Sequence, residues 1–372
     1  MKIPLAKPVL NDKMIDAAID ALQNERFVLG ESVFKFEEEF ARYCGAKYGI
    51  STNSGTDALQ LSLIALGIGK GNEVITTPWT FIATSNVVLH VGATPVFADV
   101  NLSTYTIDPN EITKALSERS KAIIPVHIYG YPAEMDSIME IAEERGLKVI
   151  EDACQAHGAI YNGRKVGAIG HVGCFSFYPS KNMTVCGDGG MIVTNDEEIA
   201  ERIAKLRNCG RRTKYEHDMI GYTARLNTVN AAIGLVQLKY LDEWNDKRRK
   251  HAKEYRKYLK HIEDIVLPPE GNDKIRPVYH LFVIRVKDPR DRDPLMEWLK
   301  ANGVECGVHY PIPVHLQPIY KELFGFKEGS YEISEMLAKT VLSLPMFPEL
   351  TDDQIHYVCE KVEEYFEKKI GR

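Results

Sequence analysis

The sequence has no excess of positive charge and no long uninterrupted apolar segment. Lys and Arg number 46 against 52 Asp and Glu, which gives a formal net charge of −6. Proteins that bind nucleic acid or anionic membranes normally present a basic face, so this balance argues against both partners. The opening residues, MKIPLAKPVLNDKMID, lack the apolar centre of a signal peptide. We therefore expect neither a membrane-spanning helix nor a secretory leader.

The cysteines show neither a metal-binding nor a disulfide pattern. There are seven, an odd number, scattered along the chain without a CxxC pair. We therefore expect no metal site and no disulfide framework, and a reducing cytoplasm is the simplest location. Repeats of fixed period and low-complexity tracts are absent too. With 44% hydrophobic and 26% charged residues over 372 positions, the chain has the composition of a globular protein of two or three domains, not of a disordered or fibrous one.

Short apolar runs alternate with helical patterns over the first two-thirds of the chain. The runs are rich in Val and Ile and are bounded by Gly, Pro or polar residues, as buried strands are. The predicted strands are Tyr48–Thr52, Glu73–Thr77, Pro95–Ala98, Lys121–Val126 and Leu147–Glu151. The predicted helices are Thr56–Leu66, Phe81–Val91, Pro109–Ser117 and Met135–Arg145. This alternation is typical of βαβ units, so we predict an α/β fold with a mostly parallel sheet and helices on both faces.

A different pattern begins near residue 228. Apolar residues spaced three to four apart predict one long helix, or two abutting helices, over Thr228–His261. We interpret the basic second half of this segment, KRRKHAKEYRKYLK, as a solvated helix face.

A smaller α+β pattern follows the Pro-Pro-Glu-Gly stretch at residues 268–271. Its predicted elements are a strand at Tyr279–Val286, a helix around Pro294–Asn302, a strand near Val304–Tyr310 and a last helix with Thr351 as N-cap. We therefore predict a large α/β domain over residues 1–245 and a small α+β C-terminal domain over residues 246–372.

The first predicted strand leads into a stretch suited to phosphate. Thr52–Asp57 (TNSGTD) ends the strand and opens a helix. Small residues let a ligand approach the backbone, hydroxyls donate hydrogen bonds, and N–H groups at a helix start face outward, which together make a phosphate cradle. The stretch matches neither a P-loop nor a GxGxxG fingerprint, and a capped helix start without a ligand would also explain it.

Two further stretches carry reactive groups at strand ends. In Ile150–His157 (IEDACQAH) an apolar strand runs into Asp152, and open α/β sheets bind ligands at the carboxyl ends of their strands. A carboxylate there can hold a proton on a heteroaromatic nitrogen, or it can cap the next turn. In Gly173–Lys181 (GCFSFYPSK), which precedes the turn CGDGG, a strand delivers Ser176 and then Lys181. A lysine among aromatic residues can become an amine nucleophile through desolvation, whereas most loop lysines are surface charges.

A phosphate cradle, an acid for a ring nitrogen and an amine for an aldehyde are the three handles of pyridoxal phosphate. With these residues the sequence resembles the DegT/DnrJ/StrS-type sugar-nucleotide aminotransferases, which share the stretches EDACQAHG, FSFYPSKN and GDGG in this order. The resemblance extends from about residue 3 to residue 346. It implies the aspartate aminotransferase fold (fold type I), with a seven-stranded sheet between helices and a smaller C-terminal domain.

The resemblance also implies a role for each residue of the cofactor site. Lys181 would form the Schiff base with pyridoxal phosphate and move the substrate proton, and Asp152 would pair with the pyridinium nitrogen. The other implied cofactor contacts are Gly55, Thr56 and Ser176 at the phosphate, Gln155 near the phenolic oxygen, Trp79 on the ring, and Asn227 reaching the phosphate from the neighbouring subunit. Trp79 could instead be a core aromatic at a helix start.

Substrate contacts are implied at the edge of this site. They are Tyr178, Arg211, Arg225, His309, Tyr310 and His315, of which His315 could instead be a structural histidine. Residues 205–225 hold six basic against two acidic residues, a local surplus that suits a dianionic cofactor or a nucleotide diphosphate. The negative net charge of the whole chain therefore does not exclude an anionic small molecule.

The function implied is that of an aminotransferase that converts a nucleotide-linked keto-sugar to an amino-sugar by a ping-pong reaction. Glutamate is the expected amino donor, and a homodimer with shared active sites is the expected assembly. A sugar dehydratase of the same family is one alternative, but such relatives replace the Schiff-base lysine with histidine, whereas this chain has Lys181. Desulfuration would need a mobile cysteine, and Cys186 is too close to Lys181 to serve. A non-catalytic regulatory protein is the last alternative, and we expect no spare domain for DNA binding.

Overall fold

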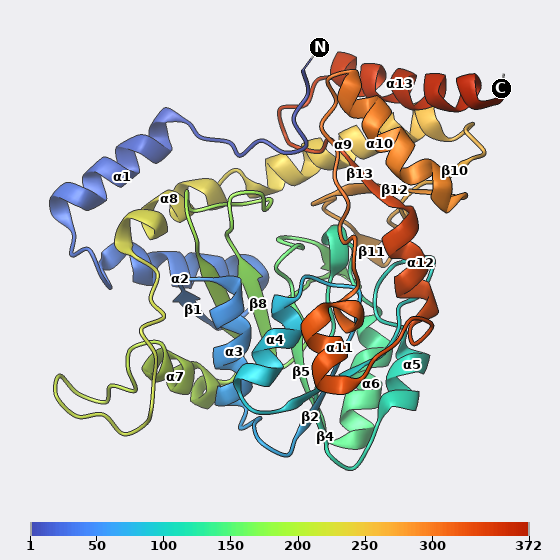
Figure 1. Cartoon of the computed structure of the whole chain (residues 1–372). Helices are drawn as coiled ribbons and strands as arrows, with labels where there is room; N and C mark the ends of the chain where they lie inside the picture. The colour runs from blue at the N-terminus through green and yellow to red at the C-terminus, as the bar shows by residue number, and fades with distance from the viewer. Residues whose placement is uncertain (1, 371–372) are drawn as a thin grey trace.

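The central sheet of the protein is built from strands of residues 48–194 (Figure 1). The computed structural model describes residues 2–370. Across the sheet, the strands follow the order β1 (Tyr48–Thr52), β9 (Gly190–Thr194), β8 (Val172–Ser176), β5 (Lys148–Asp152), β4 (Ser120–Ile124), β2 (Glu73–Thr76) and β3 (Thr94–Phe97). All pairs from β8 to β3 are parallel, and β9 runs antiparallel to both of its neighbours. The prediction of an α/β fold with a mostly parallel seven-stranded sheet is confirmed.

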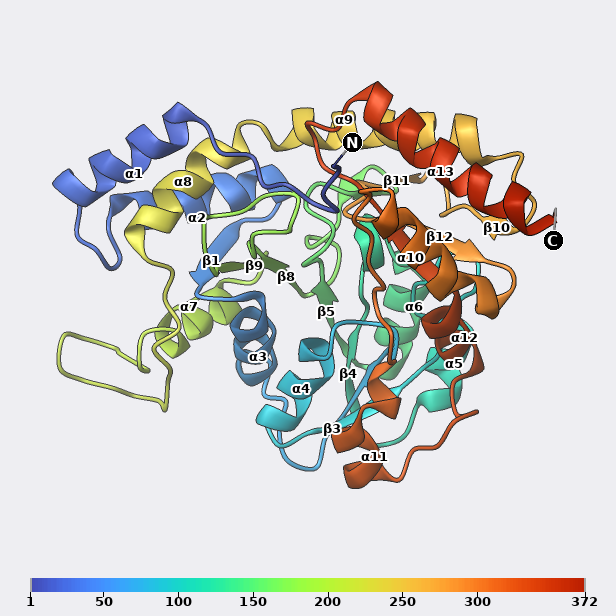
Figure 2. The same ribbon diagram turned by 45° about the horizontal axis from the view of Figure 1, so that its top comes forward.

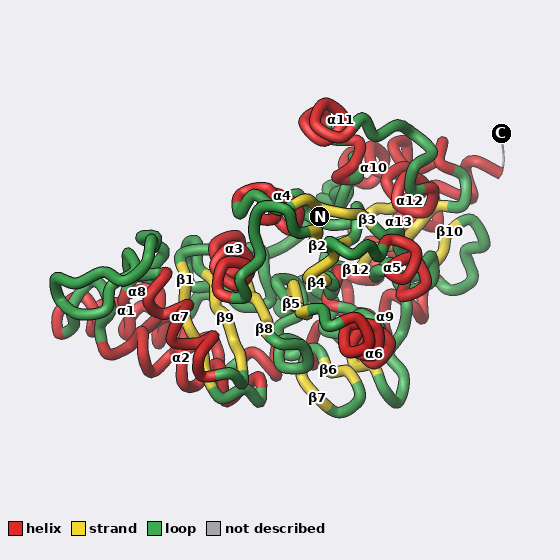
Figure 3. Tube along the Cα trace, turned by 90° about the horizontal axis from the view of Figure 1, so that it is seen from below, coloured by secondary structure: helices red, strands yellow, loops and turns green. Residues whose placement is uncertain are grey.

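Each face of the sheet has its own hydrophobic core, because successive side chains of a strand point to opposite faces. Ile123 belongs to one core and the next residue, Ile124, to the other. The first core is covered by α2 (Glu31–Cys44), α5 (Pro109–Ala115) and α6 (Met135–Arg145). The second is covered by α3 (Gly55–Ala65), α4 (Ala83–His90) and α7 (Glu197–Leu206). Figure 3 shows helices on both sides of the strands, which explains why the strands are continuous apolar runs in the sequence.

The pattern over residues 228–261 forms two abutting helices, α8 (Thr228–Leu238) and α9 (Leu241–Leu259). At their junction the ring of Tyr240 stacks on Trp244, with the ring centroids 5.7 Å apart. The helix α1 (Asp12–Asn24) packs against α8, whereas α9 continues into the C-terminal part and lies beside α13 (Asp352–Ile370) (Figure 2). The predicted domain boundary at residue 245 falls inside α9.

The C-terminal part has a small antiparallel sheet and a core of its own. The strands of this sheet are, in spatial order, β10 (Ile265–Val266), β12 (Phe282–Val286) and β13 (Val341–Leu344). The helices of this part, besides α13, are α10 (Arg292–Ala301), α11 (Pro318–Phe324) and α12 (Glu332–Thr340). Thr351 caps α13 as predicted, because its Oγ1 accepts the N–H of Gln354 at 3.2 Å. A third sheet joins β11 (Ile275–Arg276), β6 (Ile160–Tyr161) and β7 (Arg164–Lys165).

Two details of the prediction for the C-terminal part are wrong. The segment near Val304–Tyr310 is not a strand, because Val304 and Gly307 make isolated bridges to two different segments, at Ile3 and Ser343. The strand expected from Tyr279 begins only at Phe282. Tyr279 has a left-handed backbone with φ of 44°, which lies outside the extended region that a strand requires.

Candidate active site

Asp152 is the last residue of β5, the middle strand of the large sheet, and it is 5% exposed. Its Oδ2 accepts a hydrogen bond from Thr84 Oγ1 of α4 at 2.8 Å, and its Oδ1 accepts the N–H of Cys154 at 3.2 Å. The preceding side chain, Glu151, points to the other face, where it lies 3.0 Å from His127 Nε2. Strand alternation therefore places only the second carboxylate of the Glu-Asp pair on the α4 side.

The first turn of α3 lies against the end of β8. Ser54 caps the helix with its side chain, and Gly55 and Thr56 are its first residues. A Cβ atom on Gly55 would lie 2.7 Å from the Cβ of Ser176 and 2.9 Å from the Sγ of Cys154, so the position admits only glycine without a shift of its neighbours. This close approach places the outward-facing N–H groups of the helix beside a hydroxyl, which is an arrangement that favours a phosphate group.

Lys181 lies in the loop after β8, where its N–H donates to the carbonyl of Tyr178 at 2.8 Å. Desolvation lowers the pKa of the Lys181 amine, and the nearby Cys154 and Asp152 partly oppose this effect. Because β8 runs parallel to β5 and pairs with it up to Asp152, the loop that carries Lys181 leaves the sheet at the same edge as Asp152. A lowered pKa raises the fraction of neutral amine, the form that attacks an aldehyde. Tyr178, by contrast, is 54% exposed.

Gln155 links the large sheet to the C-terminal part. Its Oε1 accepts the N–H of Tyr129 at 2.8 Å, and its Nε2 donates to the hydroxyl of Tyr310 at 3.2 Å. Trp79 packs edge-on against Tyr310, with the ring centroids 6.4 Å apart. The hydroxyl of Tyr129 donates to the carbonyl of His309. Residues from four distant stretches of the sequence therefore meet beside β5.

The site region contains two buried histidines, His157 and His280, and the half-buried His309. Burial, with a smaller contribution from the charge of Lys181, lowers the pKa of His157 to about 3 and that of His309 to about 4. Burial also holds the pKa of His280 well below its usual value, and its Nδ1 lies 3.3 Å from Oδ1 of Asn182. All three imidazoles are therefore neutral at pH 7 and add no positive charge beside the amine.

Arg211, Arg225 and Asn227 lie on the segment between α7 and α8. Asn227 caps α8, and within residues 2–370 no hydrogen bond of these three residues reaches the Lys181 site. His315 is fully buried, with its Nε2 3.0 Å from Oε1 of Glu335. Its surroundings match the alternative of a structural histidine.

Sequence reasoning missed three residues that support the site. Cys154 lies inside the EDACQAHG stretch, so the motif itself could have drawn attention to its thiol. Thr84 and Tyr129 lie on a helix and a turn that carry no motif, and only the fold brings them to Asp152 and Gln155.

Residues 2–370 contain no group of three His, Cys, Asp or Glu side chains arranged to hold a metal ion. None of the helices described is long and apolar enough to cross a membrane. All seven cysteines are free thiols.

The residues of this site fit pyridoxal phosphate. The amine of Lys181 suits the aldehyde, and the carboxylate of Asp152 suits a protonated ring nitrogen. The N–H groups at the start of α3, which Gly55 lets pack closely against Ser176, suit the phosphate. The aldehyde, the ring nitrogen and the phosphate of the cofactor thus each have a matching group at the same edge of the sheet.

Comparison with known proteins agrees with this arrangement. The model of the DegT/DnrJ/EryC1/StrS aminotransferase family matches residues 8–363. The chain is 45% identical, over 95% of its length and 92% of the relative's, to dTDP-3-amino-3,4,6-trideoxy-alpha-D-glucose transaminase of Streptomyces venezuelae. It is 46% identical, over 93% of its length and 92% of the relative's, to the pleiotropic regulatory protein of Geobacillus stearothermophilus.

Solved structures show the same similarity. The crystal structure of S. venezuelae DesV in complex with a ketimine intermediate matches with a TM-score of 0.91 and 44% identity, over 95% of this chain and 94% of that one. The family model and these matches each extend over nearly the whole chain. The chain therefore belongs to the DegT/DnrJ/EryC1/StrS aminotransferase family.

Proposed function

We propose that this protein is an aminotransferase that converts a nucleotide-linked keto-sugar to an amino-sugar, with pyridoxal 5'-phosphate as cofactor and glutamate as amino donor. Family membership supports the reaction class, and the name of the S. venezuelae transaminase supports a sugar nucleotide as substrate. The observation that carries the proposal is the meeting of the Lys181 amine, the Asp152 carboxylate and the Gly55–Ser176 cradle at one edge of the sheet.

Each of these groups has a distinct task. Bound pyridoxal phosphate supplies an electron sink that stabilises negative charge on the substrate carbon. The amine of Lys181 holds the cofactor and, once displaced by the donor, takes and returns the substrate proton in both half-reactions. Asp152, oriented by Thr84, keeps a proton on the ring nitrogen. The start of α3 and Ser176 hold the phosphate and so fix the orientation of the ring.

We propose that the active form is a homodimer in which Arg211, Arg225 and Asn227 complete the site of the partner subunit. Within residues 2–370 the hydrogen bonds of these residues do not reach the Lys181 site. Large apolar side chains are exposed nearby, and such patches are typical of interfaces. They are Ile15, Ile19, Leu22, Phe27 and Phe34 of α1, α2 and their connection. An active protein that sediments only as a monomer would contradict this arrangement.

The dehydratase and the regulatory alternatives lack support from the site. The retained Lys181 disfavours the dehydratase, whose relatives carry histidine there. The name of the G. stearothermophilus relative points to regulation, yet a purely regulatory protein has no need for an amine of lowered pKa beside Asp152. We further propose domains over residues 1–245 and 246–372, and a cytoplasmic location where the free thiols stay reduced.

The proposed function is tested by a single half-reaction. The enzyme is converted to its pyridoxamine form with glutamate, freed of donor, and mixed with nucleotide keto-sugars that differ in nucleotide and in C3 or C4 keto position. We expect one of them to restore the absorbance of the pyridoxal form and to yield an amino-sugar nucleotide. The same sugars without a nucleotide serve as control. If no nucleotide keto-sugar accepts nitrogen, the proposed function is wrong.

A further inference from the structure

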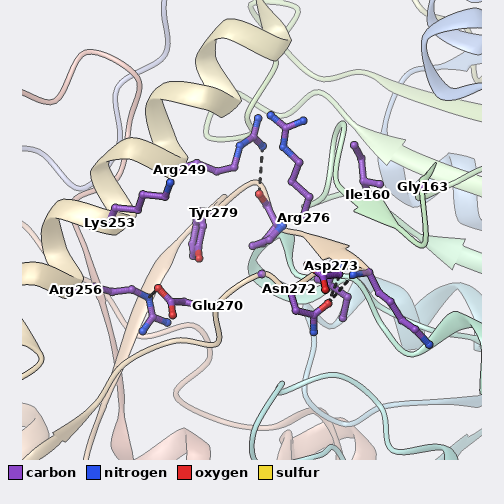
Figure 4. A pocket seen from close by; sticks show the side chains of 14 residues that line it. Ile160, Gly163, Arg249, Lys253, Arg256, Glu270, Asn272, Asp273, Arg276 and Tyr279 are labelled. Atoms are coloured by element: carbon purple, nitrogen blue, oxygen red, sulfur yellow. Dashed lines mark hydrogen bonds and ion pairs between the residues drawn. The ribbon is translucent and has the colours of Figure 1, made fainter.

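Apart from the Lys181 site, the protein has a pocket of about 530 Å³ between α9 and the segment of residues 270–279 (Figure 4). None of the predicted cofactor or substrate residues lines it. Pockets of about 300–1,000 Å³ are the size that holds metabolites. The family site at Lys181 does not account for this pocket.

Residues 277–280 separate the pocket from the active site. Pro277 and Tyr279 line the pocket. Val278 and His280 instead contact Asn182. The carbonyl of Val278 accepts a hydrogen bond from Asn182 Nδ2 at 3.1 Å, and His280 Nδ1 lies 3.3 Å from Asn182 Oδ1. Asn182 follows Lys181 in the sequence. The pocket is therefore a distinct site that shares one wall with the catalytic centre.

The basic half of α9 forms one wall of the pocket. Arg249, Lys253 and Arg256 are spaced by four and three residues, which places them on one face of the helix. Lys274, just before β11, and Arg276, within β11, add two more basic side chains from another wall. Most lysines of this half of α9 are exposed, but three of its basic residues also line the pocket.

Acidic residues neutralise only part of this charge. Arg249 and Arg276 share Asp246 at 2.6 and 2.9 Å. Nε of Arg256 lies 3.2 Å from a carboxylate oxygen of Glu270, but this buried nitrogen has no acceptor in hydrogen-bond geometry among residues 2–370. Figure 4 shows the Arg256–Glu270 pair at one end of the pocket, with Arg249 and Arg276 at the other.

Lys253 and Lys274 are available to a ligand. The ion pairs that form around the pocket within residues 2–370 involve neither amine. Five basic residues line the pocket against two acidic ones, in a chain whose net charge is −6. Like charges held together in a cavity favour a bound counter-charge, and guanidinium groups bind oxyanions through paired hydrogen bonds.

We propose that this pocket binds a small multivalent oxyanion, of the phosphate or polycarboxylate class, separately from the cofactor and the substrates. The three arginines supply positive charge along the pocket, and the two lysines supply point charges from opposite walls. The ligand also touches Tyr279, so it contacts the segment that carries His280 to the active site.

The test uses the purified holoenzyme at physiological salt and isothermal titration calorimetry. Pyrophosphate is the probe in one arm and citrate in the other, so the arms distinguish a phosphate ligand from a polycarboxylate. The variants Lys253→Glu and Lys274→Glu reverse charges that make no ion pair around the pocket. Lys247→Glu is the matched control, because it makes the same change on the opposite face of α9, outside the pocket.

We expect at least one probe to bind the wild type with Kd below about 1 mM, which corresponds to about −4 kcal/mol. Each pocket variant should weaken this binding at least tenfold, and the control should change it less than twofold. An anion bound at the Lys181 site instead would be insensitive to Lys253→Glu. Absence of binding by both probes, binding that the pocket variants leave unchanged, or binding that Lys247→Glu weakens equally would each overturn the proposal.

Discussion

Gly55 offers the sharpest test of the phosphate cradle, because the space for its missing side chain is already taken. A methyl group there would lie 2.7 Å from Cβ of Ser176 and 2.9 Å from Sγ of Cys154. Both distances are too short for non-bonded atoms. Ser176 cannot easily yield, because it ends β8 and is paired with Gly190 of β9. In Gly55→Ala the start of α3 must therefore move away from β8.

The size of the effect follows from overpacking. Inserting one methyl group into a tightly packed position costs about 1–3 kcal/mol. Because the displaced N–H groups are those that face the phosphate, we expect most of this cost to appear in cofactor affinity. Each 1.4 kcal/mol is tenfold, so the Kd for pyridoxal phosphate should rise by about tenfold to a hundredfold.

The assay is a titration of apoprotein with pyridoxal phosphate followed by absorbance, with thermal unfolding measured in parallel. Gly69→Ala is the matched control, since an added Cβ there meets only the carbonyl oxygen of Val91 at 3.4 Å. The control should bind the cofactor like the wild type. If Gly55→Ala also binds it with wild-type affinity, the start of α3 does not hold the phosphate, and the assignment of the cradle is wrong.

Three further predictions concern groups around the site and its support. Asp152→Asn should slow nitrogen transfer about 100-fold in single turnovers, because a neutral amide cannot pair with a protonated ring nitrogen, while Thr84 can still donate to the amide oxygen. Glu37→Gln should lower the free energy of unfolding by about 3–5 kcal/mol in denaturant titrations, since it leaves the buried guanidinium of Arg207 without its charged partner. His157 has a pKa of about 3 in the folded protein against 6.5 when unfolded, so the unfolded state binds the extra proton and stability falls as the pH drops through 6.5 toward 3. Between pH 7 and pH 5 the free energy of unfolding of the wild type should therefore fall by about 2 kcal/mol more than that of His157→Leu. Equal decreases in both proteins would contradict the burial argument.

The parts of the fold that the sequence predicted are those governed by local pattern. Strands buried on both faces require continuous Val and Ile runs, and such runs marked β1 to β5 to within two residues. The position of Asp152 at a strand end followed from the same pattern, and so did the cap at Thr351.

The rest depends on contacts between distant segments. The hydrogen bond from Gln155 to Tyr310 joins two loops that are far apart in the sequence, and no local pattern predicts it. The segment after Val304 has strand-like composition but lacks a continuous partner strand. The basic half of α9 looks in sequence like an ordinary solvated face, and only the fold of residues 270–279 closes a pocket against it.

The central claim, that Lys181 transfers nitrogen to a nucleotide keto-sugar, is tested most directly by following ¹⁵N from labelled glutamate. Wild type and Lys181→Ala are each loaded with cofactor and mixed with donor and the accepted keto-sugar, and the label in the amino-sugar nucleotide is measured by mass spectrometry over time. We predict rapid labelling by the wild type and a loss of at least about 1,000-fold in the variant, because no other group in the site replaces the amine as proton carrier. Equal rates of labelling in the two proteins would contradict the account.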